Sequence, residues 1–255
     1  MLLKTEYLSK SFGGLSAVRD LDLTVSKREI VGLIGPNGAG KTTVLNLISG
    51  FLRPTKGKIV FEGQDITGLQ GQKIASKGIA RTFQIKNTFS NLSVLENIVL
   101  ALNLTTSASI RRALASIVMH RVKQEEKAMI SRAMSILSDI RLEELANTKA
   151  GVLPLAQEKF LGLMMAVVEK PKLLLLDEPV AGMNREEMVR FMTFVVEYAQ
   201  DMNMGVLLVE HTMAAIMNYC TRVVVLNYGE QIACGTPKEI RSNPNVQKAY
   251  LGERI

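Results

Sequence analysis

The segment Gly35–Thr43 has the spacing of a phosphate-binding loop, because it reads GPNGAGKTT and matches G-x4-G-K-[S/T]. Phosphate oxygens need several N–H donors that converge on one point, and Gly38 and Gly40 let the backbone approach without a Cβ clash. Lys41 supplies a positive charge for the β and γ phosphates, and Thr42 supplies a hydroxyl for Mg²⁺. The residues expected to bind the phosphates are Gly35, Pro36, Asn37, Gly38, Ala39, Gly40, Lys41, Thr42 and Thr43.

Further candidate residues lie where apolar runs end. Asp177 follows LLLL, and a carboxylate at the end of a buried strand can hold the hydration shell of a metal ion. Glu178 comes next and can polarise an attacking water as a general base. His211 follows VLLVE; it is either an ordinary histidine at a strand end or a γ-phosphate contact that senses hydrolysis. Gln84 ends another predicted strand, from which its amide can reach the metal ion or the water.

The elements that must position these residues follow an α/β pattern. Residues 1–34 alternate short apolar runs with turns, which predicts antiparallel strands followed by one buried strand. Residues 41–49 predict a helix that Gly50 terminates, and GIARTFQ predicts a strand that ends at Gln84. The runs LLLLD and GVLLVEH are typical of parallel strands covered on both faces. The helix predicted between them, over residues 185–202, implies a right-handed crossover in a parallel sheet.

The middle of the chain has a different pattern from its two ends. Over residues 93–169 apolar positions recur at spacings of three and four, which predicts helices. A chain of 255 residues, 47% of them hydrophobic, is long enough for one large domain with a substantial core. We therefore expect a single domain over residues 1–255, with a core and β subdomain at about 1–86 and 170–255 and an inserted helical subdomain at about 87–169.

Composition excludes several classes of function. The net charge of +7 is compatible with nucleic acid or an anionic membrane surface, but a solvated basic surface is the simpler interpretation. The two cysteines and two histidines are too few and too scattered for a structural zinc site, and separated thiols fit a reducing compartment. The N-terminus, MLLKTEYLSKSF, is too short and polar for a signal peptide, and no run approaches the roughly 20 apolar residues of a membrane span. We expect any membrane role to come through partner proteins.

These residues together resemble the ATP-binding cassette family, the ATPase subunits of ABC transporters, over nearly the whole chain. In that family's terms Gly35–Thr43 is the Walker A loop, Gln84 the Q-loop residue, Asp177 and Glu178 the Walker B pair, and His211 the switch histidine. The resemblance implies a P-loop ATPase core with a mostly parallel sheet, an N-terminal antiparallel β subdomain and an inserted α-helical subdomain. It also implies ATP and Mg²⁺ as ligands and hydrolysis coupled to transport, with Thr42, Gln84 and Asp177 near the metal ion.

Phe12 lies at the position of the aromatic residue that stacks on adenine in this family, although an ordinary core phenylalanine explains it too.

More narrowly, the chain looks like the LivG branch of branched-chain amino-acid importers. The segments that carry this resemblance are SKSFGGLSAV, IARTFQ, LSVLENIVLA, VVVLNYGEQIACGTP and NPNVQKAYLGE. DEPVAGMN also resembles the importers of urea and short amides, so the solute stays open. The resemblance implies a second ATP-binding subunit (LivF-like or a second copy), two membrane permease subunits, indirectly a solute-binding protein, and no nucleic acid. It places the chain at the cytoplasmic face of the inner membrane, bound through the permeases.

The family's signature motif, LSGGQ, is replaced here by Leu153, Pro154, Leu155, Ala156 and Gln157. The family implies a head-to-tail dimer in which each signature faces the ATP on its partner's Walker A loop. Pro154 lacks both a hydroxyl and an N–H, although it suits the first turn of a helix. Leu155 and Ala156 add side chains where the backbone must approach an anion. We therefore expect a heterodimer with one competent site and one weak site; a homodimer would have two weak sites.

Two other readings remain within the same family. The altered signature favours a non-hydrolysing regulatory subunit, whereas the intact Glu178 and His211 oppose it. A non-transport ATPase of DNA repair or translation is the other reading. Such proteins carry long coiled-coil insertions or two cassettes in one chain, and this sequence has neither feature.

Overall fold

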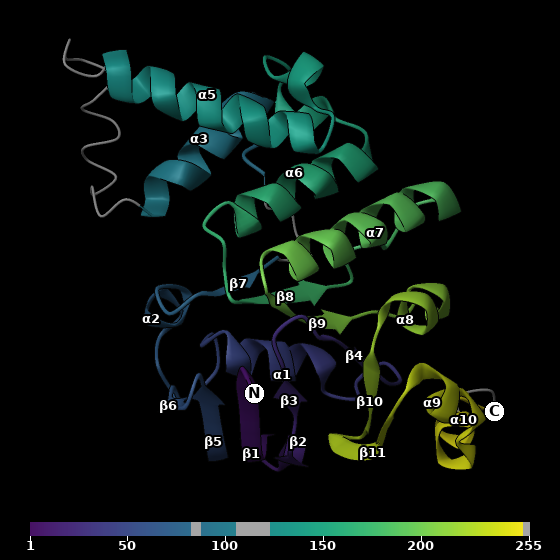
Figure 1. Ribbon diagram of the computed structural model, residues 1–255. Helices are drawn as coiled ribbons and strands as arrows, with labels where there is room; N and C mark the ends of the chain where they lie inside the picture. Colours follow the sequence, from purple (N-terminus) through teal and green to yellow (C-terminus); the bar gives the residue numbers. More distant parts are fainter. Residues whose placement is uncertain (83–87, 106–122, 252–255) are drawn as a thin grey trace. The chain divides into compact units, whose positions relative to one another are not determined.

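The computed structural model describes residues 1–82, 88–105 and 123–251 (Figure 1). The chain forms two compact units, which are Met1–Arg81 with Pro171–Ile255 and, separately, Thr82–Lys170. We call the first the sheet unit and the second the helical unit. Sheets and helices together make the mixed α/β fold that the sequence predicts.

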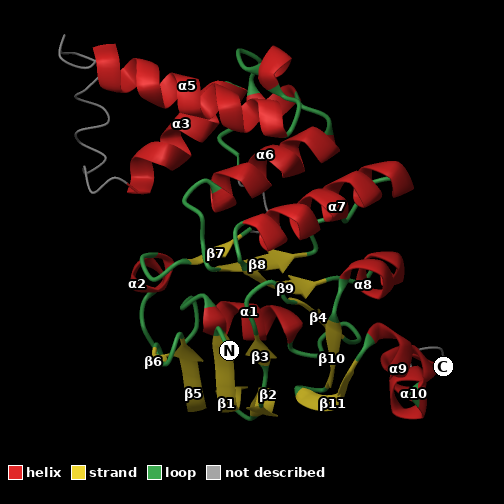
Figure 2. Cartoon of the chain, viewed as in Figure 1, coloured by secondary structure: helices red, strands yellow, loops and turns green. Residues whose placement is uncertain are grey.

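The sheet unit contains two sheets (Figure 2). One is antiparallel, with β1 between β2 and β5, β6 beyond β5, and β3 also paired with β1. The other has the order β11-β10-β4-β9-β8-β7 and is parallel from β10 to β7. The strands of the first sheet are β1 Leu3–Phe12, β2 Leu15–Leu21, β3 Thr24–Val25, β5 Lys56–Phe61 and β6 Gln64–Asp65. Those of the second are β4 Ile30–Ile34, β7 Ile79–Arg81, β8 Leu173–Asp177, β9 Gly205–Val209, β10 Arg222–Asn227 and β11 Glu230–Gly235.

Helices accompany the sheets and form most of the second unit. In the sheet unit they are α1 Lys41–Ile48, α2 Gly71–Ala75, α7 Arg185–Asp201, α8 Met213–Tyr219, α9 Pro237–Ser242 and α10 Pro244–Leu251. In the helical unit they are α3 Val94–Thr105, α5 Lys123–Asp139, α6 Leu155–Val167 and the 3₁₀ helices η2 Glu143–Leu145 and η3 Ala150–Val152. No helix in the described ranges is both long and apolar enough to cross a membrane.

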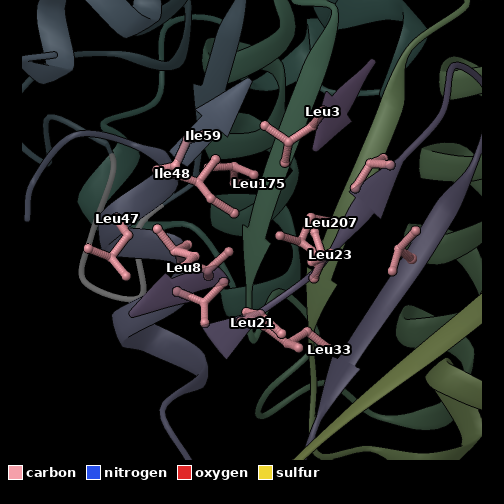
Figure 3. Close-up of a cluster of buried hydrophobic side chains, with 14 of the residues drawn as sticks. Leu3, Leu8, Leu21, Leu23, Leu33, Leu47, Ile48, Ile59, Leu175 and Leu207 are labelled. Carbon is pink, nitrogen blue, oxygen red and sulfur yellow. The ribbon is translucent and has the colours of Figure 1, made fainter. Parts of the chain in front are cut away.

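The core of the sheet unit fixes the position of α1. Strands β4, β8 and β9 are buried along their whole length, as their continuous apolar runs predict. Leu47 and Ile48 of α1 share one buried cluster with Leu8 of the first sheet and with Leu175 and Leu207 of the second (Figure 3). Each such side chain stabilises the fold by about 1.5–3 kcal/mol. Because α1 packs against residues of both sheets, the helix that follows the phosphate-binding loop is fixed in position by the core.

Sequence predicted the end of helix α1 and the end of strand β7, and the second of these predictions is wrong. Helix α1 stops where Gly50 takes φ +75°, and the N–H of Phe51 donates to the carbonyl of Asn46 at 2.9 Å, so the predicted termination is confirmed. Strand β7 ends at Arg81 instead of Gln84, and Gln84 itself lies outside the described residues. Strand β7 is an edge strand, and its last pair in the ladder with β8 joins Arg81 to Leu175.

The altered signature segment begins helix α6 of the helical unit. Pro154 is the N-cap, with φ −53° and ψ 147°, and its carbonyl accepts the N–H of Glu158 at 3.0 Å. The helix that was predicted to form is therefore present, but Pro154 precedes its first turn instead of lying within it. The extended backbone of an N-cap residue is one that proline adopts readily, although Pro154 offers no side-chain hydrogen bond to cap the helix. Thr88 adds a hydrogen bond from its hydroxyl to the carboxylate of Glu158, at 2.9 Å.

Candidate functional site

The loop between β4 and α1 has the backbone that a phosphate site requires. Gly40 has φ +101°, and a Cβ there would lie 2.3 Å from the carbonyl oxygen of Ala17, so no other residue fits. Gly38 has φ +76° with open space around its Cα, so it is needed for its backbone conformation and not to avoid a clash. Asn37 and Gly38 are exposed at the tip of the loop. An anion can therefore reach the N-terminus of α1 from the solvent.

Lys41 lies inside this loop. Its side chain is buried, with the residue 6% exposed, and its Nζ donates to the carbonyl oxygens of Gly35 at 2.7 Å and Pro36 at 2.8 Å. The first helical turn thus carries a buried ammonium group next to exposed Thr42. Phosphate oxygens are stronger acceptors for this charge than carbonyl groups are, so this ammonium group could exchange its two carbonyl contacts for contacts to a phosphate.

Asp177 is buried at the end of β8 and forms an ion pair with Arg81 of β7. Nη2 of Arg81 lies 3.0 Å from Oδ2 of Asp177, and their side chains are 7% and 2% exposed. Arg81 also donates to Oδ1 of Asn46 at 2.6 Å and to Oγ of Ser49 at 3.0 Å, so it links α1 to β8. Burial raises the pKa of Asp177, against the opposing effects of the Arg81 and Lys41 charges.

The carboxylate of Asp177 fits the role of a metal-binding group. Its Oδ1 is buried and has no hydrogen-bond partner among the described residues, which leaves an acceptor for a hydrated cation. Arg81 contacts both Asp177 and Asn46 of α1, the helix that begins at Lys41 of the phosphate-binding loop. Mg²⁺ binds to one or two carboxylates plus phosphate oxygens, and Asp177 with Thr42 would supply the protein ligands.

Glu178 and His211 are brought together from two neighbouring strands. Oε1 of Glu178 lies 3.0 Å from Nε2 of His211, and their side chains are 28% and 42% exposed. Glu178 has φ +49°, an uncommon conformation for a non-glycine residue, and its N–H donates to the carbonyl of Val209 at 2.8 Å. A carboxylate in contact with a histidine at a solvent-open strand end can activate a water molecule.

Phe12 and the signature residues Leu153–Gln157 were predicted to contact ATP, and the structure describes each of them. Phe12 ends β1 and is 47% exposed, which does not agree with a core position, and Nζ of Lys10 lies 4.9 Å from its ring centroid. The signature residues belong to the helical unit, where Leu155 is 46% exposed at the start of α6. Ala156 is buried, and Oε1 of Gln157 is buried without a hydrogen-bond partner among the described residues.

Comparison with known proteins identifies the family. The family model described as ABC transporter matches residues 18–181, which is more than half of the chain. The chain belongs to the ABC transporter ATP-binding family. A second family model, described as branched-chain amino acid ATP-binding cassette transporter, matches residues 230–255. As an ABC ATP-binding subunit, the chain is an ATPase whose activity is coupled to transport.

Similar proteins span the whole length of this ABC subunit. The high-affinity branched-chain amino acid transport ATP-binding protein BraF of Pseudomonas aeruginosa is 39% identical over 99% of this chain and 98% of its own length. The corresponding LivG protein of Escherichia coli (strain K12) is 40% identical, with the same coverage. Among solved structures, an ATP-binding cassette of an ABC transporter in its ADP conformation has a TM-score of 0.85 and 31% identity, over 98% of both chains.

Sequence reasoning missed two residues of this ABC ATPase. One is Arg81, which forms an ion pair with Asp177. The other is Glu210, a buried acid between β9 and His211 that accepts hydrogen bonds from backbone N–H groups. In the sequence, these two residues are marked only by being charged residues at the end of an apolar run. That signal does not identify the distant partners, because Asp177 lies 96 residues from Arg81 and Val180 lies 30 residues from Glu210.

Proposed function

We propose that this chain is the ATP-hydrolysing subunit of an ABC importer for branched-chain amino acids. The observation that carries the proposal is the identity of about 40% to BraF and LivG over nearly the full length. The branched-chain family match at residues 230–255 agrees with it. The importers of urea and short amides are the second candidate, since DEPVAGMN resembles theirs.

In the proposed mechanism the loop Gly35–Thr43 binds the phosphates of ATP, and Phe12 stacks on the adenine. Asp177 and Thr42 hold Mg²⁺, which neutralises charge on the phosphates when it is bound. Glu178 orients and deprotonates the attacking water, and His211 contacts the γ-phosphate. The contact between Glu178 and His211 at 3.0 Å supports this assignment, and Gln84 remains a proposed ligand of the metal ion or water.

We propose that the chain works as one cassette over residues 1–255, with residues 87–169 as a helical subdomain. It acts at the cytoplasmic face of the membrane through two permease subunits, with a solute-binding protein as an indirect partner. A LivF-like subunit forms the head-to-tail dimer with it. ATP on this chain meets the partner's signature motif, whereas ATP on the partner meets Leu153–Gln157 of this chain.

Uptake measurements test the transported solute. In cells that lack the gene for this chain, uptake of radiolabelled leucine, isoleucine and valine is expected to fall by at least about tenfold, because transport requires the hydrolytic step. Wild-type chain restores uptake, whereas Lys41→Ala does not, because the phosphates lose their buried charge. Loss of urea or acetamide uptake with normal leucine uptake would instead support the second candidate.

Restoring the signature motif tests the weak site. The variant Pro154→Ser, Leu155→Gly, Ala156→Gly is expected to raise ATP hydrolysis by the assembled transporter about twofold, because two working sites then replace one. Each missing donor costs the altered site about 2.7–4 kcal/mol, or about 10²–10³ in rate. Leu155 is 46% exposed, so its removal costs little packing.

The control for the signature variant is Val152→Gly, which removes a 71% exposed apolar side chain just before the motif and is expected to leave turnover unchanged. Turnover is measured as phosphate release at saturating Mg-ATP. An unchanged rate in the triple variant would contradict the idea of an impaired second site.

A further inference from the structure

Glu210 is a buried acidic residue whose carboxylate is surrounded by backbone N–H groups. It follows β9 directly and is 2% exposed, although a buried carboxylate is costly unless hydrogen bonds satisfy it. Its Oε1 accepts the N–H of Val180 at 2.9 Å, and its Oε2 accepts the N–H groups of His211 at 3.1 Å and Thr212 at 3.2 Å. All three donors are backbone groups, and they come from two separate segments.

These two segments carry the reacting pair. Val180 lies two residues after Glu178, and His211 immediately follows Glu210. One further hydrogen bond joins the segments, from the N–H of Glu178 to the carbonyl of Val209 at 2.8 Å. Because the side chains of Glu178 and His211 are partly exposed, surrounding packing alone does not set their separation of 3.0 Å. Beyond the ladder between β8 and β9, which ends at Asp177 and Val209, the carboxylate of Glu210 connects the backbone on both sides of the pair.

Only a carboxylate can make this connection. An ionised carboxyl group is acceptor-only at both oxygens, and its hydrogen bonds to N–H groups are about twice as strong as neutral ones. A glutamine of the same shape has one acceptor oxygen and one NH₂ donor. Its NH₂ would face either Val180 or the His211–Thr212 pair, so one of the two segments would lose its hydrogen bonds and leave buried donors unsatisfied.

We propose that Glu210 is a positioning residue that holds Glu178 and His211 at reacting distance by binding both of their backbone segments. The proposal rests on the proposed function in one respect, which is that Glu178 and His211 act on ATP. It adds that the geometry of this pair is maintained by a buried group that does not touch the nucleotide.

The test is Glu210→Gln in the assembled transporter. We expect kcat for ATP hydrolysis to fall on the order of 10²-fold, because misplacement by about 1 Å can cost that much. KM for ATP should stay unchanged, since the phosphate-binding loop is not altered. The matched control is Glu239→Gln, which removes a carboxylate that accepts the N–H of Thr236 at 2.7 Å in the cap of α9. It should leave both constants unchanged.

Two further measurements separate this proposal from the proposed function. Hydrogen exchange on the nucleotide-free chain should speed up at the amides of Val180 or of His211 and Thr212 in Glu210→Gln, whatever the chemistry of Glu178. In a Glu178→Gln background, Glu210→Gln should lower turnover no further. If Glu178→Gln itself leaves turnover unchanged, the proposed function fails while the exchange result still stands.

A second variant, Glu210→Asp, provides a test if Glu210→Gln does not fold. Glu210→Asp keeps both acceptor oxygens but shortens the side chain by one methylene, so it should fold and show a reduced kcat with normal KM. Unchanged exchange in Glu210→Gln, or wild-type kcat in either variant that folds, would overturn the positioning role.

Discussion

Replacing Glu178 by Gln is expected to slow ATP hydrolysis by about 10²–10⁴-fold, the usual contribution of a general base. The amide has the size of the carboxylate but cannot accept a proton from water, so the chemical step is blocked. The phosphate-binding loop and Asp177 are untouched, and ATP should therefore still bind. The variant is expected to retain uncleaved ATP in the site.

Two measurements check this outcome. Phosphate release by the assembled transporter gives the rate, and the nucleotide that stays bound after gel filtration gives the trapped species. Glu186→Gln is the matched control, because Glu186 is an exposed acid in the first turn of α7 and its loss removes the same charge nearby. Normal turnover in Glu178→Gln would remove this residue from the mechanism.

Replacing Arg81 by Met is expected to lower the free energy of unfolding by about 3–5 kcal/mol, because it leaves a buried carboxylate without its partner. Asp177 is 2% exposed at its side chain, so water cannot readily replace the lost guanidinium. Arg81 also donates to Asn46 of α1 and to Ser49, the residue that follows α1, so the same change removes hydrogen bonds between β7 and the end of this helix. A loss of this size is a large part of the roughly 5–15 kcal/mol that stabilises a protein.

The midpoint of urea unfolding, measured without nucleotide, checks this expectation. The double variant Arg81→Met, Asp177→Asn should recover much of the lost stability, because it removes the unpaired charge together with its partner. A double variant no more stable than Arg81→Met would show that packing and not the ion pair dominates. A midpoint unchanged in Arg81→Met would contradict the role assigned to the pair.

The sequence by itself determined those parts of the site that lie within one strand, turn and helix. The phosphate-binding loop could be predicted because its glycines, Lys41 and Thr42 are adjacent in the chain, and the conformation they require is local. The acids after LLLL could be predicted for the same reason, since a continuous apolar run marks a buried strand and its end marks an edge of the sheet. The fold class followed from the alternation of such runs with helical patterns.

Tertiary structure alone decided which distant side chains meet. Arg81 pairs with Asp177 because β7 and β8 are neighbours in the sheet, and the pattern of either strand contains no information about its neighbour. Glu210 meets the N–H of Val180 for the same reason, across β8 and β9. Both contacts depend on the order of strands, which long-range packing selects, whereas the predicted motifs depend only on the backbone conformation of consecutive residues.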